Sequence, residues 1–211
     1  MLRLLNFSKA YGTIPVLNTT NISLDQGIYW IKGTNGSGKS TLLKAIAGII
    51  HSEGDIVAHE TSINEQPVAY RKLISFAEAE PLFPEFLTGM DMIKLFASAR
   101  DAKPGEEKPR LEEMNMLSYI NDPVGTYSSG MLKKLSIVLA FLGSPQIILL
   151  DEPLITLDAT SIQILYRWIV TQHDGQNTNF LISSHQPLDI DSTIHIKQLH
   201  ISEGNIISLP A

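Results

Sequence analysis

A short stretch of the chain, residues 33–41 with the sequence GTNGSGKST, combines three glycines with a lysine. Glycines let consecutive backbone N–H groups turn inward around a phosphate, and a helix that begins at such a loop points its positive end at the same place. Lys39 and Ser40 stand at the offsets of the G-x-x-x-x-G-K-[ST] pattern, in which the lysine reaches the terminal phosphates and the hydroxyl binds magnesium. An ordinary glycine-rich turn would explain the glycines but not the Lys-Ser pair. The predicted nucleotide-binding residues are Gly33, Thr34, Asn35, Gly36, Ser37, Gly38, Lys39, Ser40 and Thr41.

Two consecutive carboxylates, Asp151 and Glu152, end the apolar run of residues 146–152. A carboxylate at the end of a buried strand is costly unless it meets a cation or hydrogen-bond donors, and a magnesium ion shared with Ser40 would compensate Asp151. Glu152 would project into the crevice at the carboxyl end of the sheet, where it can orient or deprotonate a water that attacks a γ-phosphate. The alternative is an acidic turn that caps the next helix, and the phosphate loop elsewhere in the chain makes this alternative the weaker one.

A serine–glycine turn at Ser128, Ser129 and Gly130 precedes the acidic strand and opens a helical pattern. The N-terminus of that helix would offer a second set of backbone N–H groups to an anion. One phosphate loop already accounts for one triphosphate. The second anion site therefore suggests a second nucleotide that is shared with another copy of the chain.

The segments that must position these residues alternate between strand-like and helix-like patterns. Short runs of apolar, β-compatible residues predict strands at 1–7, 21–25, 28–32, 73–78, 146–152 and 178–185. Helical spacing of apolar residues predicts helices at 42–50, 88–100, 111–120, 128–143 and 161–170. Thr88 and either Ser128 or Ser129 are the expected N-caps, residues 101–110 are an expected loop, and 194–209 an expected hairpin turning at 203–205.

The near-continuous apolar runs predict strands that are buried on both faces, as in a parallel sheet covered by helices. We therefore expect an α/β fold: a P-loop NTPase core with a mainly parallel sheet, an antiparallel β portion from the N-terminal region, and a small helical subdomain. That subdomain would lie near residues 82–142. A length of 211 residues fits one domain spanning residues 1–211.

Composition narrows the function classes. The net charge is −6 and no cluster of Lys and Arg occurs, so we expect no nucleic-acid partner. The absence of cysteine excludes disulfides, thiolate metal sites and a cysteine nucleophile. No apolar stretch approaches the length needed to cross a bilayer, and the N-terminus does not read as a secretion signal. We expect a cytoplasmic protein that would need a partner to act at a membrane.

In this order and spacing, the segments resemble the nucleotide-binding domain of an ABC transporter over nearly the whole chain. Residues 33–41 match the Walker A loop of that family, and IILLDEP matches Walker B with Glu152 at the catalytic glutamate. YSSGM stands where the family signature usually reads L-S-G-G-Q. LITLD resembles the D-loop ending in Asp158, and ISSH resembles the switch segment with His185 as the histidine that senses the γ-phosphate.

Tyr11 stands where the family often has an aromatic residue that stacks on adenine. Such stacking would give little base readout, and a role as an ordinary turn residue is an equal alternative.

The resemblance implies that two copies of the chain sandwich two ATP molecules head to tail. In each site one chain would give the phosphate loop, Asp151, Glu152 and His185, and Lys39 would act with Mg²⁺ to stabilise charge on the transferring phosphoryl group. The other chain would give the signature residues and Asp158. Closure on ATP and opening after hydrolysis would drive membrane permease subunits on separate chains.

The YS-x-GM form and the short helical insertion are similar to ATPases of bacterial export systems. The resemblance thus implies an ATP-hydrolysing exporter subunit. It would form a homodimer held at the inner face of the cell membrane by its permease.

The sequence departs from the family pattern at two places. Ser129 replaces the usual glycine, and its Cβ would narrow the approach to the partner's γ-phosphate and slow hydrolysis. The glutamine expected after the strand at 73–78 is also missing, and either Glu78 or Glu80 takes its place. We align Glu80, because a carboxylate can bind magnesium directly or through water.

Other assignments remain open at this stage. The apolar residues of PLFPEFL, 81–87, are either docking points for a permease or packing residues between two subdomains. A soluble ATPase of this family that serves DNA repair or translation would need a coiled-coil insertion or a tandem domain, and neither occurs. A P-loop kinase usually needs an Arg-rich lid, whereas residues 81–122 contain only Arg100 and Arg110. The altered signature and the missing glutamine are also compatible with a regulatory subunit that binds ATP but hardly hydrolyses it.

Overall fold

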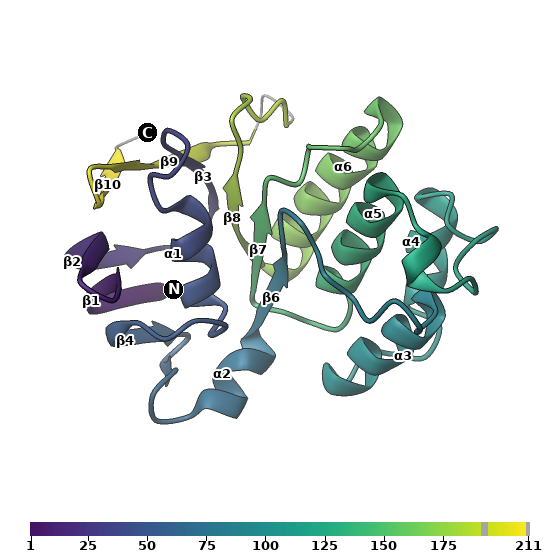
Figure 1. Cartoon of the computed structure of the whole chain (residues 1–211), viewed down its shortest axis with the longest axis horizontal. Coiled ribbons are helices and arrows are strands. Elements are labelled where there is room, and N and C mark those ends of the chain that lie inside the picture. Colours follow the sequence, from purple (N-terminus) through teal and green to yellow (C-terminus); the bar gives the residue numbers. More distant parts are fainter. Residues whose placement is uncertain (191–193, 210–211) are drawn as a thin grey trace.

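The computed structural model describes residues 1–190 and 194–209, which form two β-sheets and a group of helices (Figure 1). The larger sheet has the order β10-β9-β3-β8-β7-β6 and is parallel except for the β9–β10 hairpin. Its strands are β3 (Ile28–Lys32), β6 (Ile74–Ala77), β7 (Ile147–Asp151), β8 (Asn179–Ser183), β9 (Ile196–Ser202) and β10 (Asn205–Leu209). The prediction of a mainly parallel sheet is therefore confirmed.

The smaller sheet is antiparallel, has the order β2-β1-β4-β5 and comes from the N-terminal region, as expected. Its strands are β1 (Leu2–Tyr11), β2 (Ile14–Leu24), β4 (Glu53–Ala58) and β5 (Thr61–Ser62). The predicted strands at 1–7 and 21–25 were too short, because β1 and β2 run on into a hairpin that turns at Gly12 and Thr13.

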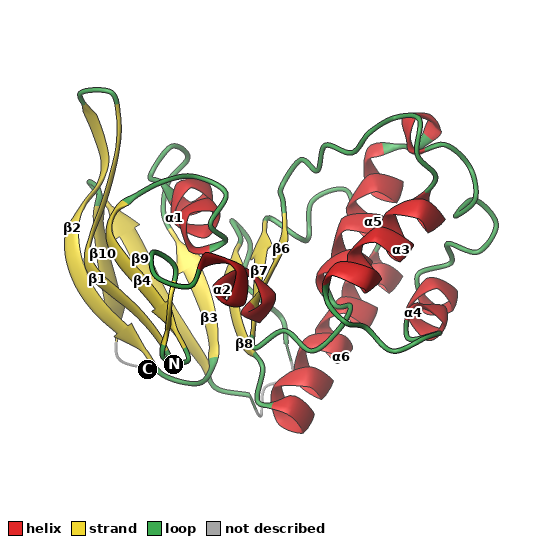
Figure 2. Ribbon diagram, turned by 90° about the horizontal axis from the view of Figure 1, so that it is seen from below, coloured by secondary structure: helices red, strands yellow, loops and turns green. Residues whose placement is uncertain are grey.

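The large sheet is buried on both faces, and its side chains divide by the two-residue period of a strand. In β7, Ile147 and Leu149 join the core around α1 (Lys39–Ile46), whereas Ile148 and Leu150 join the core on the other face. The core around α1 also contains Leu4 and other residues of the small sheet, so α1 lies between the two sheets (Figure 2). This arrangement places the N-terminus of α1 at the carboxyl ends of the parallel strands.

The other face of the large sheet carries most of the helices. They are α3 (Gly89–Ala99), α4 (Glu107–Glu113), α5 (Ser129–Ala140) and α6 (Ala159–Gln176), with α2 (Pro67–Leu73) beside β6 (Figure 2). The Thr88 hydroxyl caps α3 and Ser128 caps α5, as predicted. None of the helices in the described ranges 1–190 and 194–209 has the length and apolar character of a membrane span.

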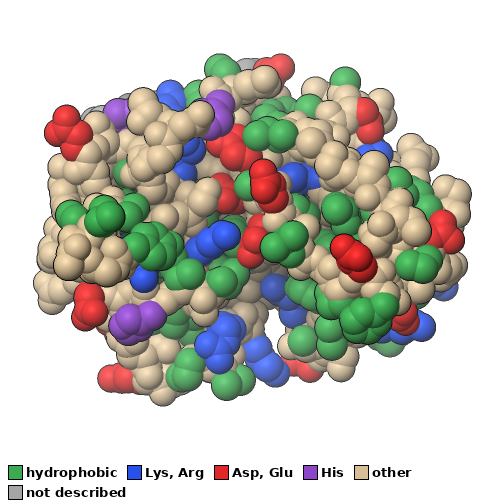
Figure 3. Space-filling view, viewed as in Figure 1, with side chains coloured by type: hydrophobic (Ala, Val, Ile, Leu, Met, Phe, Trp, Pro, Cys, Tyr) green, Lys and Arg blue, Asp and Glu red, His purple; other side chains and the backbone are tan. Residues whose placement is uncertain are grey.

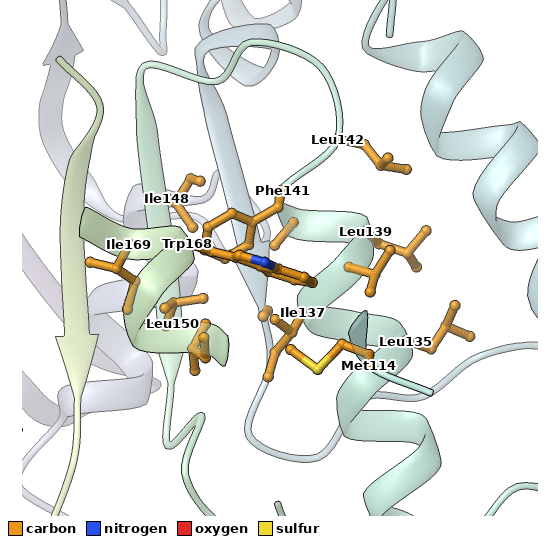
Figure 4. Close-up of a cluster of buried hydrophobic side chains, with 14 of the residues drawn as sticks. Met114, Leu135, Ile137, Leu139, Phe141, Leu142, Ile148, Leu150, Trp168 and Ile169 are labelled. Atoms are coloured by element: carbon orange, nitrogen blue, oxygen red, sulfur yellow. The ribbon is translucent and has the colours of Figure 1, made fainter. Parts of the chain in front are cut away.

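On the face drawn in Figure 3, Lys and Arg side chains are interspersed with Asp and Glu, and a hollow opens at the lower middle of the view. Inside the molecule, Trp168 of α6 packs against Phe141 with ring centroids 5.4 Å apart (Figure 4). Met114 and residues of α5 and β7 surround this pair. The core thus fixes α5 and α6 to the strand that ends in Asp151.

The helix expected at 161–170 was too short, because α6 spans Ala159–Gln176. Other predicted boundaries were wrong for local reasons. The helix expected at 42–50 ends at Ile46, and Gly48 then takes a left-handed φ of 70° that a helix cannot continue. The helix expected at 111–120 ends at Glu113, followed by Asn115 at φ 56°. Part of the loop expected at 101–110 belongs to α4, because Pro109 sits in the first helical turn, where a missing N–H costs nothing. The strand β4 and the helix α2 were not predicted.

Candidate functional site

The loop between β3 and α1 has a shape that favours glycine. Gly36 and Gly38 have φ values of 76° and 105°, in the left-handed region that other residues avoid. A Cβ on Gly38 would also lie 2.9 Å from the Leu17 side chain, and one on Gly33 would lie 2.6 Å from the Ile201 carbonyl oxygen. The glycines are therefore required by backbone conformation and by close packing, and α1 starts directly behind them.

The ammonium of Lys39 lies over this loop. The side chain is only 7% exposed, and Nζ donates hydrogen bonds to the carbonyl oxygens of Gly33 at 2.9 Å and Thr34 at 3.2 Å. These neutral acceptors hold the charge in place. A phosphate would offer stronger, charge-assisted hydrogen bonds to the same ammonium.

A cavity of about 450 Å³ lies above the loop. It is lined by Val16, Asn35, Gly36, Ser37, Gly38, Lys39, Ser40, Thr41, Glu152 and His185. The loop residues come from the N-terminus of α1, and Glu152 and His185 follow β7 and β8 directly or closely. The structure thus brings together three predicted groups: the phosphate loop, the candidate general base and the candidate phosphate sensor.

Glu152 and His185 are paired in this cavity. The Nε2 atom of His185 lies 3.3 Å from Oε1 of Glu152, and the backbone N–H of His185 donates to Oε2 at 3.4 Å. Glu152 is 8% exposed and has a φ of 44°, which is uncommon for a residue with a side chain. Within the described residues, no donor makes a well-formed hydrogen bond to its buried Oε1. The basic group nearest to this buried oxygen in the described chain is the imidazole of His185.

Asp151 lies behind the cavity and is fixed by a serine that sequence reasoning did not single out. The fully buried Ser183 hydroxyl donates to Oδ1 of Asp151 at 2.6 Å and accepts a hydrogen bond from the Glu152 N–H at 2.9 Å. Asp151 and Ser183 face each other in the parallel register of β7 and β8. In the sequence, Ser183 is the first serine of ISSH. Its partner, Asp151, becomes evident only from the register of the two strands.

Ser128, Ser129 and Gly130 lie outside the cavity, at the N-terminus of α5. The Ser128 hydroxyl accepts a hydrogen bond from Met131 N at 3.3 Å, and Ser129 is exposed. A Cβ on Gly130 would lie 2.9 Å from the carbonyl oxygen of Thr156, so the D-loop segment passes close to this turn. The chain therefore does not bring the signature residues to its own phosphate loop.

Asp158 caps α6 and also lies outside the cavity. Its carboxylate accepts hydrogen bonds from Ser161 N at 2.8 Å and from the Ser161 hydroxyl, and it forms an ion pair with Lys134 of α5 at 3.0 Å. The backbone N–H of Ser161 and the Lys134 ammonium hold the pKa of Asp158 at about 2. The D-loop carboxylate is thus already bound within its own chain.

The remaining predicted residues lie at the periphery. Tyr11 is 51% exposed, with the Lys9 ammonium 4.7 Å from its ring centroid, and it does not line the cavity. Glu80 is exposed, whereas Glu78 extends toward α1, with Oε2 3.8 Å from Lys44 Nζ. Neither glutamate lines the cavity.

The donor set fits a magnesium ion of the type that binds with a nucleotide. Among the residues that the structure describes, no group of three or more His, Cys, Asp or Glu side chains could hold a metal alone. Mg²⁺ usually takes one or two carboxylates and completes its shell with water and substrate phosphates. Asp151, with one carboxylate oxygen bonded to Ser183, and the exposed Ser40 suit such a site.

Comparison with known proteins gives a family for this site. The family model described as ABC transporter matches residues 17–155. The chain is 30% identical to the lantibiotic transport ATP-binding protein SrtF of Streptococcus pyogenes, over 98% of this chain and 89% of that protein. It is also 30% identical to the bacitracin transport ATP-binding protein BcrA of Enterococcus faecalis, over 94% of this chain and 68% of that protein.

Solved structures give the same fold. The ATP-binding subunit of an ABC transporter matches with a TM-score of 0.88 and 26% identity, covering 98% of this chain and 88% of that one. A dimeric ATP-binding cassette in a post-hydrolysis state, bound to ADP and Pi, matches with a TM-score of 0.82 and 22% identity over the full length of both chains. The second likeness concerns the fold alone.

Proposed function

The chain belongs to the ABC transporter family as an ATP-binding ATPase subunit, and from this premise we propose that its catalytic site is the cavity above residues 33–41. The observation that carries the proposal is the meeting of Lys39, Glu152 and His185 in that cavity. The loop binds the phosphates of ATP through its backbone N–H groups and the N-terminus of α1.

Each side chain takes a role that its contacts support. Lys39 exchanges the Gly33 and Thr34 carbonyl oxygens for the terminal phosphates. The Glu152 carboxylate lines the cavity beside Lys39, and it accepts a hydrogen bond from the attacking water when the nucleotide is bound. His185 holds Glu152 from one side and donates to a γ-phosphate oxygen when the nucleotide is bound.

Ser40 and Asp151 would hold Mg²⁺, and Glu80 would contribute directly or through water. A bound ion would neutralise negative charge on the phosphate oxygens. Ser183 orients Asp151 for this role. Tyr11 stacks on the adenine base, with one face of its ring near the Lys9 ammonium.

The second half of each site comes from another copy of the chain. The helix α5 presents its N-terminus with Ser128, Ser129 and Gly130 away from the cavity of its own chain. These groups, with Asp158, complete the partner's site in a head-to-tail homodimer. The unit that dimerises is a single domain over residues 1–211, with a helical subdomain at about 82–142.

We further propose that membrane permease subunits on separate chains dock in a groove between α2 and α3. The groove has a volume of about 390 Å³, and its lining includes Arg71, Leu82, Phe83 and Arg100. Lys and Arg side chains gather around the hollow in Figure 3, in the region where α2 and α3 face each other in Figure 1.

The segment PLFPEFL, residues 81–87, has residues that suit each of its two interpretations, docking to a permease and internal packing. Phe83 and Leu87 pack against the core, whereas Leu82 is 92% exposed and Phe86 is 82% exposed. Burial lowers the pKa of the Arg100 guanidinium to about 10, and this group donates to Ser75 without a carboxylate partner in the described ranges. A permease loop with apolar side chains and one carboxylate would complement the groove.

The transport direction that we propose is export, with the chain on the cytoplasmic side of the membrane. Relatives named for lantibiotic and bacitracin transport and the YS-x-GM form of the signature support this direction.

The experiment that tests the ATPase site compares the wild-type chain with Glu152→Gln. The carboxamide cannot act as a base, so we expect phosphate release to fall about 100-fold or more. The affinity for ATP, measured with a fluorescent analogue, should stay within about threefold because Lys39 and the loop are untouched. Glu112→Gln, an exposed carboxylate on α4, is the matched control. A wild-type chain that binds ATP but releases no phosphate would favour a regulatory subunit.

A further inference from the structure

The proposed mechanism does not use Lys133, a buried lysine on α5. Only 2% of this residue is exposed. Its Nζ donates hydrogen bonds to the backbone carbonyl oxygens of Glu78 at 2.8 Å, of Ala79, and of Asp151 at 3.5 Å. An ammonium has three N–H donors, so these three carbonyls use its full capacity.

Burying the Lys133 ammonium costs free energy that its contacts must offset. Within the described ranges, no carboxylate oxygen lies within 4 Å of the Lys133 ammonium. A buried charge without such a partner must be compensated by hydrogen bonds. The compensating carbonyls belong to two segments that flank the site: the chain after β6, at 78–79, and the end of β7.

The next residue, Lys134, makes a parallel link to other elements. Its ammonium pairs with Asp158 at 3.0 Å and donates to the carbonyl oxygen of Met114 at 3.2 Å. The turn of α5 that follows Gly130 thus touches the D-loop through one lysine and the catalytic strand through the other. The Lys133 link ends one residue before Glu152, whose backbone already has a positive φ.

We propose that Lys133 is a positioning residue that transmits the placement of α5, and with it the signature turn, to Glu152. This inference rests on the proposed function. When the partner's nucleotide binds at residues 128–130, α5 shifts as a rigid helix, and the ammonium carries segment 78–79 and the end of β7 with it. Hydrolysis is then fast only when both halves of the site are in place.

The test compares Lys133→Met and Lys133→Gln in the full-length chain. Methionine keeps the apolar stem but removes all three donors, whereas the glutamine amide keeps two. We expect kcat for ATP to fall about 10- to 100-fold in Lys133→Met, as for other residues that orient a catalytic group. KM should stay within about twofold, because Lys133 does not line the nucleotide cavity. Lys133→Gln should retain an intermediate kcat.

The matched control is Lys108→Met, which removes an exposed lysine from α4. If Lys133→Met and this control have the same kcat, the inference is wrong. It is also wrong if kcat falls only together with a lower melting temperature and a changed KM. If Lys133→Met does not fold, the Lys133→Gln comparison decides by the same criteria. If the wild-type chain binds ATP without hydrolysing it, the proposed function fails and this inference fails with it. If the wild-type chain hydrolyses ATP and Lys133→Met matches the control, only this inference fails.

Discussion

The hydroxyl of Ser183 joins the two acids of the site, because it donates to Asp151 and accepts from the Glu152 N–H. We predict that Ser183→Ala lowers the apparent affinity for Mg²⁺ in ATP hydrolysis about 10- to 100-fold, the usual loss when the partner of a metal ligand is removed. Stability should also fall by about 1–3 kcal/mol, since the buried Glu152 N–H loses its acceptor. A magnesium titration of ATPase activity measures the first effect and urea unfolding the second.

The chain offers a close control in Ser62, which is 6% exposed. Its hydroxyl also donates to an aspartate, Asp55, and accepts from backbone N–H groups, far from the cavity in sequence and outside its lining. Ser62→Ala should lose stability without changing the magnesium dependence. Equal magnesium curves for Ser183→Ala and Ser62→Ala would contradict the role given to Ser183.

Ser129 gives a prediction in the opposite direction. Its Cβ lies at the exposed start of α5, where the partner's γ-phosphate would approach. Ser129→Gly should therefore raise kcat for ATP, while the loss of helix propensity lowers stability by up to about 1 kcal/mol. Ser129→Ala keeps the Cβ and should keep the slow rate. Turnover that is the same in all three proteins would show that the Cβ is not the obstacle.

For these residues, the sequence predicted which side chains take part in the chemistry but not which atoms they contact. The motif spacing predicted Lys39, Glu152 and His185, and the cavity brings them together. Ser183 and Lys133 escaped prediction because their partners are set by strand register and by a chain segment more than fifty residues away in sequence.

The N-cap of helix α6 is Asp158, whose carboxylate accepts a hydrogen bond from Ser161 N and forms an ion pair with Lys134. Removing such an N-cap costs about 1 kcal/mol, so Asp158→Ala should lower the free energy of unfolding by about that amount at pH 7. Asp174→Asn, a substitution of an exposed acid in the same helix, is the control and should change stability by less than about 0.5 kcal/mol.

The same cap gives a pH dependence with a defined sign. Its hydrogen bonds hold the pKa of Asp158 at about 2, below the ordinary value of 3.8. Because the pKa of Asp158 is lower in the folded chain than in the unfolded chain, its carboxylate stabilises the folded state at pH values above the unfolded-state pKa. This stabilisation is lost as the pH falls through the folded-state pKa. The difference between wild type and Asp158→Ala should therefore shrink between about pH 4 and pH 2. A difference that stays constant over this range would contradict the cap.

Long, regular elements followed from the sequence, and short ones depended on context. The apolar run of β7 and the capped helices α3 and α5 were predicted because both period and caps agreed. In contrast, α4 contains Pro109 and has only seven residues, so local preference favoured a loop. Its Leu111 is nevertheless buried, which shows that packing against the core stabilises this helix.

The fold places the phosphate loop and the signature turn in different parts of the described chain. The cavity with the phosphate loop opens at the carboxyl ends of the parallel strands, whereas the signature turn begins α5 on the other face of the large sheet, outside that cavity. Neither group can complete the other within one chain. This separation is the physical reason for proposing a head-to-tail dimer, with permease docking at the groove between α2 and α3.

The measurement that tests this account most directly is multi-angle light scattering of the Glu152→Gln chain with Mg²⁺-ATP, with Mg²⁺-ADP and without nucleotide. The variant should bind ATP but stall before hydrolysis, so we expect the closed state to accumulate. We predict a mass near 23.3 kDa without nucleotide or with ADP, and twice that mass with ATP. A chain that binds ATP and stays at the mass of a monomer would contradict the shared site.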